Sequence, residues 1–146
     1  MNQETTPSIL FLCTGNSCRS QMAEGLCRER FGQQFAIYSA GIEAHGINPF
    51  AVTAMAEIGI DISTHKSQTL AQLDRDTFDI VVTVCSHADR HCPLLEARLK
   101  RIHKGFDDPP KLAANETSDE ARLAHYRRVR DEIDVFLQEF CPTLKF

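Results

Sequence analysis

The chain has 146 residues, of which 42% are hydrophobic and 25% charged, and its formal net charge is −4. A chain of this length can bury one sizeable core, so we expect a single domain over residues 1–146. The mildly acidic balance, with both signs interspersed, argues against nucleic acid as a partner. No stretch is long and apolar enough to span a membrane, so no membrane association is expected.

The cysteines indicate the compartment. Residues 1–7 are too polar for a secretory signal peptide, and the chain contains six cysteines. In the cytosol such thiols stay reduced, and a disulfide there is more often transient and catalytic than structural. We therefore expect a cytoplasmic protein.

Apolar strand-like runs alternate with helical periodicities along the chain. Strands are expected at residues 9–13, 35–39, 79–85 and 98–103. Helices are expected at residues 20–31 and 49–58, with a short turn at 70–73 and a long helix from about 118 to 140. This alternation predicts an α/β fold with a parallel, doubly wound sheet, which places a functional loop at the carboxyl end of a strand.

The long last helix has two distinct faces. Apolar residues recur at spacings of three and four, which predicts a buried stripe: Leu123, Tyr126, Val129, Ile133, Phe136, Leu137 and Phe140. The opposite face is expected to be solvated: Arg127, Arg128, Arg130, Asp131 and Glu132. We read the preceding segment, residues 111–119, as a surface loop.

The most informative segment follows the first predicted strand. Cys13 ends the strand, a tight loop follows, and Arg19 lies just before the expected helix. Backbone N–H groups of such a loop, together with a helix N-terminus, hold a tetrahedral oxyanion, and the same field favours a thiolate at Cys13. The guanidinium of Arg19 can donate hydrogen bonds to two oxygens of the anion. The expected oxyanion-binding residues are Thr14, Gly15, Asn16, Ser17, Cys18, Arg19 and Ser20.

The remaining cysteines divide into two groups. Cys85 ends a predicted buried strand and should emerge at the same sheet edge as Cys13, and Cys92 follows after a polar stretch that can close a small disulfide ring. Two other interpretations stand beside this one, a zinc site formed with His87 and His91, and simple core packing. Cys18 is either packing or a second redox residue. No chemistry is predicted for the two cysteines on the first and last helices, Cys27 and Cys141.

Residues 13–20 resemble the phosphate-binding loop of the low-molecular-weight tyrosine phosphatases. The longer run 13–25 is more specifically similar to their relatives, the thioredoxin-coupled arsenate reductases. Further blocks resemble these families in the same order, from about residue 8 to residue 140: residues 38–42, 45–46, 48–49, 61–63, 82–86, 105–109 and 128–133.

This resemblance implies a small four-stranded, flavodoxin-like sheet and reduction of arsenate to arsenite, which detoxifies arsenic. It implies that Cys13 is the nucleophile, that Cys85 and Cys92 are the first and second resolving thiols, and that Asp108, just before a proline, is the general acid. The final disulfide would be reduced by thioredoxin, and phosphate or sulfate would compete with arsenate. The classical phosphatases lack the resolving pair.

Two competing functions remain. A phosphomonoester phosphatase, as a main or a weak side activity, needs only Cys13, Arg19 and Asp108. An anion-binding or redox-sensing module needs no acid, and it leaves the placement of Asp108 unexplained.

No tightly bound cofactor or metal is expected. Some thioredoxin-coupled reductases hold potassium beneath the loop with residues that align with Asn16, Glu24, Ser39 and an aspartate. Here Gln68 stands in place of that aspartate. Loss of a carboxylate weakens a site for a hard cation.

Overall fold

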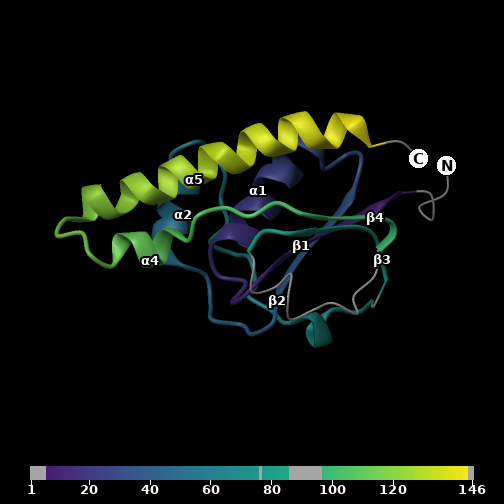
Figure 1. The fold of residues 1–146 in the computed structure, drawn as a ribbon, viewed down its shortest axis with the longest axis horizontal. Coiled ribbons are helices and arrows are strands. Elements are labelled where there is room, and N and C mark those ends of the chain that lie inside the picture. Colours follow the sequence, from purple (N-terminus) through teal and green to yellow (C-terminus); the bar gives the residue numbers. More distant parts are fainter. Residues whose placement is uncertain (1–5, 76, 86–96, 145–146) are drawn as a thin grey trace.

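The computed structural model describes residues 6–75, 77–85 and 97–144. Four parallel strands form one sheet in the order β2-β1-β3-β4, which confirms the predicted fold class (Figure 1). The strands are β1 (Ser8–Cys13), β2 (Ala36–Gly41), β3 (Phe78–Thr83) and β4 (Ala97–His103).

The strand register brings the carboxyl ends of the central strands together. Cys13 pairs with Gly41 of β2, and Leu12 pairs with Thr83 of β3. All six residues of β1 and of β3 are buried, as expected for apolar strands covered on both faces. The edge strand β4 is more exposed. The loops that leave β1 and β3 therefore meet at one edge of the sheet.

The helices are α1 (Arg19–Phe31), α2 (Pro49–Ala56), α4 (Pro109–Ala113) and α5 (Asp119–Phe140), with 3-10 turns at Leu70–Gln72 and Cys141–Thr143. None of the helices in the described part of the chain combines the length and apolar character needed to span a bilayer.

The expectation of a loop over residues 111–119 is wrong at its start, because α4 occupies residues 109–113. Two prolines, Pro109 and Pro110, open this short helix. Proline presets a helical φ and lacks a donor that the first turn would leave unpaired, so it favours helix initiation.

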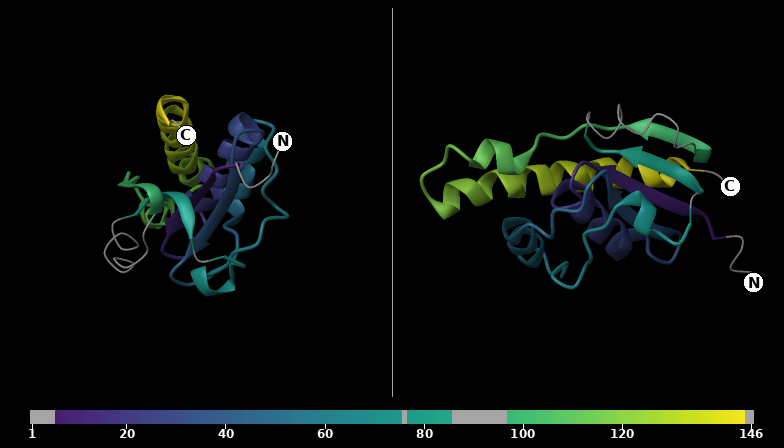
Figure 2. Two further views of the ribbon diagram at one scale, coloured as in Figure 1. Left: turned by 90° about the vertical axis from the view of Figure 1, so that its right-hand side faces the viewer. Right: turned by 90° about the horizontal axis from the view of Figure 1, so that it is seen from below.

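The long helix α5 runs across α1 on one side of the sheet, as Figures 1 and 2 show. Its predicted apolar stripe is confirmed for five of its seven residues, with Val129, Ile133 and Leu137 fully buried, whereas Phe136 and Phe140 are only partly buried. Arg130, however, was wrongly predicted to be solvated. It is only 7% exposed, and its guanidinium donates to the Ala54 carbonyl oxygen at 2.8 Å. An arginine can lie in a packed interface when its head group is paired and its stem covers apolar surface.

Candidate active site

The loop between β1 and α1 has its carbonyl groups turned to one side. The carbonyl oxygens of Cys13, Thr14, Gly15 and Ser17 all accept hydrogen bonds, at 2.9 to 3.3 Å, from backbone N–H groups in residues 42–48. In a trans peptide the N–H points opposite to the C=O of the same unit, so the loop N–H groups face away from this segment. The loop therefore presents a concave row of donors, the arrangement that binds an anion.

The β2–α2 connection can pack this closely because β2 ends in glycine. A Cβ atom on Gly41 would meet the Glu43 carbonyl oxygen, and would lie 2.7 Å from the Asn16 nitrogen and 2.8 Å from the Thr14 carbonyl oxygen. All three are backbone atoms that cannot move without distorting the loop.

We predict that Gly41→Ala lowers the free energy of unfolding by about 1–3 kcal/mol and weakens oxyanion binding. Urea denaturation and phosphate titration would measure both effects. Gly105→Ala is the control for stability, because among the described residues its added methyl group would meet the His103 side chain alone, at 3.2 Å, and no backbone atom. Equal stability of Gly41→Ala and the unmodified protein would contradict the close packing.

The side chain of Asn16 stabilises the loop through hydrogen bonds. The residue is fully buried and has a positive φ of 47°, a conformation that asparagine tolerates better than most residues. Its Nδ2 donates to Ser20 Oγ at 2.8 Å and to Ser39 Oγ at 3.0 Å. Its Oδ1 accepts from the Gln68 backbone N–H at 2.8 Å and from Gln21 Nε2 at 3.0 Å. The Asn16 side chain therefore supports the loop, and only its backbone is available to an anion.

Arg19 lies at the mouth of the loop with part of its guanidinium unpaired. Nη1 donates to the Phe106 carbonyl oxygen at 3.0 Å, and Nη2 lies 3.7 Å from Asp108 Oδ1. Nε is buried and has no hydrogen-bond partner among the described residues. A buried N–H without a partner is costly, so it marks a place where a ligand oxygen would be favourable.

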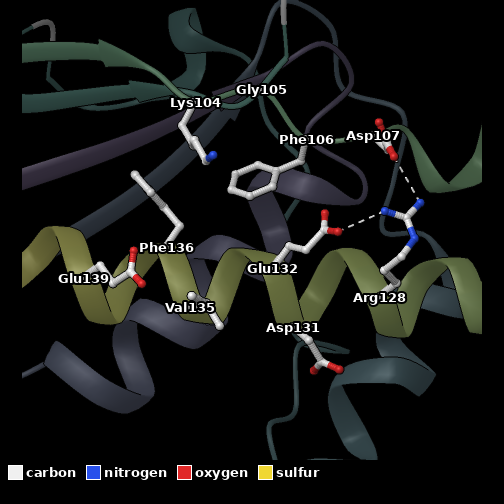
Figure 3. Close-up of a pocket in the computed structure, with 10 residues that line it drawn as sticks. All are labelled: Lys104, Gly105, Phe106, Asp107, Arg128, Asp131, Glu132, Val135, Phe136 and Glu139. Carbon is white, nitrogen blue, oxygen red and sulfur yellow. Dashed lines mark hydrogen bonds and ion pairs between the residues drawn. The ribbon is translucent and has the colours of Figure 1, made fainter.

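The two adjacent aspartates have different surroundings. Asp107 forms an ion pair with Arg128 of α5 at 3.1 Å (Figure 3). Asp108 instead lies beside Arg19, with 43% of its side chain exposed. The structure thus separates a carboxylate held by α5 from one that faces the loop, and the second is the one expected to act as the acid.

The segment that carries these aspartates is attached to the end of β3. Lys104 N–H donates to the Thr83 carbonyl oxygen at 2.8 Å, and Phe106 N–H donates to the Val84 carbonyl oxygen at 3.2 Å. On the α5 side of this segment lies a neighbouring pocket of about 870 Å³, lined in part by Phe106, Asp107 and Phe136 (Figure 3).

Cys85 emerges beside the loop, as its position at the end of β3 predicted. Its Sγ lies 3.1 Å from Thr14 Oγ1, the hydroxyl of the residue that follows Cys13, and Cys85 is close enough to Cys13 to raise the pKa of that thiol. Both cysteines are 4% exposed. A pocket of about 470 Å³ opens over this group, lined by Thr14, Arg19, Cys85, Gly105, Phe106, Asp107, Asp108, Lys111 and Leu112.

The Cys13 thiol differs from the expected thiolate. Its hydrogen bond with Cys85 and its burial raise the pKa of Cys13, whereas the Arg19 guanidinium and the Thr14 backbone N–H lower it. The net direction is upward, because the neighbouring Cys85 side chain and burial both favour the protonated form of Cys13, and together they outweigh Arg19 and the Thr14 N–H. The sequence could not show this, since it did not reveal that the two thiols touch.

Two further cysteines were predicted to belong to the site. Cys18 is 5% exposed, and burial raises the pKa of its thiol, which supports a packing role. Cys92 lies outside the described residues, as do His87 and His91. Of the four residues in the alternative zinc site, the structure therefore describes only Cys85.

Sequence reasoning missed the supports of this site. It did not predict that Gln21 would bond Asn16, or that the Phe106 carbonyl oxygen would hold Arg19. Gln21 lies directly after the loop on α1, where a polar residue at a buried position is the one available signal. Nothing in the sequence points to a backbone oxygen at residue 106.

A parallel α/β sheet with a cysteine, an anion-binding loop and an arginine at one strand end defines a cysteine-dependent oxyanion enzyme. The model of the family "Low molecular weight phosphotyrosine protein phosphatase" matches residues 8–145, and the chain belongs to this family.

Several relatives are closely similar to the chain. An arsenate reductase of Halalkalibacterium halodurans is 53% identical over 137 residues, covering 94% of this chain and 96% of the relative. An arsenate reductase of Bacillus subtilis strain 168 is 50% identical over 137 residues, which again cover 94% of this chain and 96% of the relative. A solved structure described as an arsenate reductase in the phosphate binding state has a TM-score of 0.72 at 25% identity, covering 95% of this chain and 99% of that chain.

Proposed function

We propose that this protein reduces arsenate to arsenite by a relay of Cys13, Cys85 and Cys92, and so detoxifies arsenic. The observation that carries the proposal is the position of Cys85, whose Sγ lies 3.1 Å from the hydroxyl of the residue after Cys13, in a pocket that Arg19 and Asp108 also line. A phosphatase needs the nucleophile, the arginine and the acid, but it has no use for a second thiol in contact with the first. The names of the relatives support arsenate reduction.

In the first step the loop N–H groups and Arg19 bind arsenate. The sulfur of Cys13 attacks arsenic and forms an S–As bond, while one As–O bond breaks and its oxygen leaves as water after protonation by Asp108. The proton that Cys13 loses restores the one that Asp108 gives up, so the step releases only water. Arsenic is still pentavalent at this stage.

In the second step Cys85 attacks the sulfur of Cys13. The S–S bond forms as the S–As bond breaks, and the electron pair of that bond leaves with arsenic, which becomes trivalent arsenite and takes up the proton of Cys85 on one of its oxygens. The thiols are oxidised by two electrons and arsenic is reduced by two. The contact between Cys85 and Cys13 supplies the required proximity.

In the third step Cys92 attacks Cys85, which frees Cys13 and leaves a Cys85–Cys92 disulfide. We propose that thioredoxin then reduces this disulfide by thiol–disulfide exchange. A cytoplasmic location follows from the same chemistry, because the resting enzyme needs all three thiols reduced.

A weaker phosphatase activity is the second candidate, and membership of the family supports it. Phosphate has the same shape and charge as arsenate, so Cys13, Arg19 and Asp108 should also serve phosphoryl transfer. However, Lys111 and Leu112 line the pocket after Pro109, where the classical phosphatases carry tyrosines. This favours a small anion over a phosphotyrosine side chain.

The test is NADPH oxidation with arsenate, thioredoxin and thioredoxin reductase. We expect arsenate-dependent turnover that phosphate and sulfate inhibit competitively. Absence of turnover, together with ready hydrolysis of an aryl phosphate, would overturn the reductase proposal in favour of the phosphatase.

We also propose that the loop needs no potassium ion. Glu24, which would be a ligand, accepts from Ser39 Oγ at 2.5 Å and from Arg28 Nε at 2.9 Å. Gln68 turns its Nε2 donor toward the Ser39 carbonyl oxygen at 3.2 Å. These groups satisfy one another, and the cationic Arg28 sits beside the carboxylate, so they fit a potassium ion poorly.

We predict that exchanging KCl for NaCl at equal ionic strength leaves kcat/KM within about twofold. Gln68→Asp, which restores the carboxylate, is the matched variant and should gain sensitivity to potassium. A large potassium-specific stimulation of the unmodified protein would contradict this prediction.

A further inference from the structure

An ion pair on the outer face of α5 lies one residue away from the expected acid. Arg128 Nη2 is 3.1 Å from Asp107 Oδ2, and Asp108 follows Asp107 directly in the chain. The face of α5 that carries Arg128 was expected to be solvated, and 42% of this side chain is indeed exposed. Figure 3 shows that its guanidinium nevertheless turns toward the segment that leads to the active site.

The guanidinium of Arg128 is held from two sides. Glu132, one turn further along α5, accepts from Arg128 Nη1 at 3.1 Å, and Asp107 lies at Nη2 (Figure 3). A single exposed ion pair stabilises little, because two side chains lose their freedom when it forms. Here the bond within the helix already fixes the orientation of the arginine, so less entropy is lost when Asp107 joins it. The pair can therefore restrain the backbone at Asp107.

The backbone around Asp107 is otherwise held only at its two sides. The pocket of about 870 Å³ separates part of the segment between β4 and α4 from α5, so the segment is not packed on the helix along its whole length. Before Asp107, the Phe106 N–H donates to the residue after β3. After it, the Asp108 carbonyl oxygen accepts from a backbone N–H of α4 at 3.1 Å. Between these two anchors, Asp107 is held by Arg128.

We propose that Arg128 is a positioning residue, which holds Asp107 so that the next carboxyl group, Asp108, stays beside the anion loop. The inference rests on the proposed function, in which Asp108 protonates the leaving oxygen. Consecutive Cα atoms are about 3.8 Å apart, so a shift at Asp107 is passed directly to Asp108. A general acid must stay within hydrogen-bond reach of the leaving atom, and a displacement of about 1 Å is enough to slow the reaction. Arg128 itself is not among the residues that line the pocket over Cys13.

The test compares two phosphate esters that need the acid to different degrees. Phenolate is a poor leaving group and needs a proton, whereas dinitrophenolate leaves readily without one. We expect Arg128→Met, which keeps the aliphatic stem, to lower kcat/KM for phenyl phosphate by about two- to fivefold, the range expected for an exposed ion pair. The kcat/KM for dinitrophenyl phosphate and the affinity for inorganic phosphate should be retained, because the loop and Arg19 are unchanged.

A second variant separates positioning from charge. Asp107→Ala removes the same ion pair from its other side, but it changes the net charge in the opposite direction to Arg128→Met. Loss of positioning should give both variants the same selective loss on phenyl phosphate, and the double variant should be no worse than either single one. An effect of the electric field would instead change the affinity for phosphate in opposite directions in the two variants.

Phe136→Leu is the control for a general loosening between α5 and the segment. Its ring lies 6.0 Å from the ring of Phe106 between centroids, and it makes no contact with the ion pair that any measured distance shows. Any loss of kcat/KM in this variant should be equal for the two esters, because it does not act through the acid.

Two results would overturn the positioning role: a loss in Arg128→Met that is equal for the two esters or absent from both, or opposite shifts of phosphate affinity in the two single variants. If the unmodified protein hydrolyses neither ester, kcat for arsenate decides. It should fall in Arg128→Met and Asp107→Ala alike, with phosphate affinity retained, and an unchanged kcat would overturn the inference. An unmodified protein that is inactive toward both esters and arsenate would instead refute the proposed function itself.

Discussion

Replacing Cys13 by serine is expected to abolish arsenate reduction, with a loss of at least about 10⁴-fold in kcat/KM. A serine hydroxyl is a much weaker nucleophile than a thiol, and it cannot form the disulfide with Cys85 that releases arsenite. The anion site should persist, because the loop N–H groups and Arg19 are unchanged. Steady-state NADPH oxidation and a phosphate titration measure the two properties separately.

Cys141→Ser is the control for thiol loss, because Cys141 lies at the end of α5, outside the pocket. It should retain turnover. Appreciable arsenate reduction by Cys13→Ser would remove Cys13 from the role of nucleophile, and loss of phosphate binding by this variant would show that the serine had disturbed the loop.

Replacing Cys85 by serine is expected to separate the two activities of the site. Arsenate reduction should fall by at least about 10³-fold, because the S–As bond then has no internal thiol to break it. Hydrolysis of an aryl phosphate should stay within severalfold, since it proceeds through Cys13, Arg19 and Asp108. Serine is nearly isosteric with cysteine and can keep the hydrogen bond to Thr14 Oγ1.

Assays of arsenate reduction and aryl phosphate hydrolysis on the same preparation provide the comparison. Thr14→Val is a matched variant, because it removes the hydroxyl contact to Cys85 and leaves the thiol in place; it should reduce arsenate far better than Cys85→Ser does. Equal loss of both activities in Cys85→Ser would mean that Cys85 is structural, and the phosphatase would become the better-supported function.

The sequence by itself determined the features that consecutive or regularly spaced residues encode. The apolar run that ends at Cys13, the loop and Arg19 are consecutive in the chain, so a strand, an anion loop and a helix N-terminus could be predicted from them directly. The periodic stripe of α5 likewise predicted which side packs inward, and Val129 and Ile133 are buried as expected. The strand-and-helix alternation was enough to predict a parallel sheet.

The tertiary structure alone decided which distant groups touch. Periodicity reports whether a position is buried but not which residue it meets, so the burial of Arg130 and its hydrogen bond to the Ala54 carbonyl oxygen were not predictable. The closeness of Cys13 and Cys85 was expected from the shared sheet edge and from the resemblance. Its effect on the pKa of Cys13 depends on burial and contact at the scale of single atoms, which are properties of the packed chain.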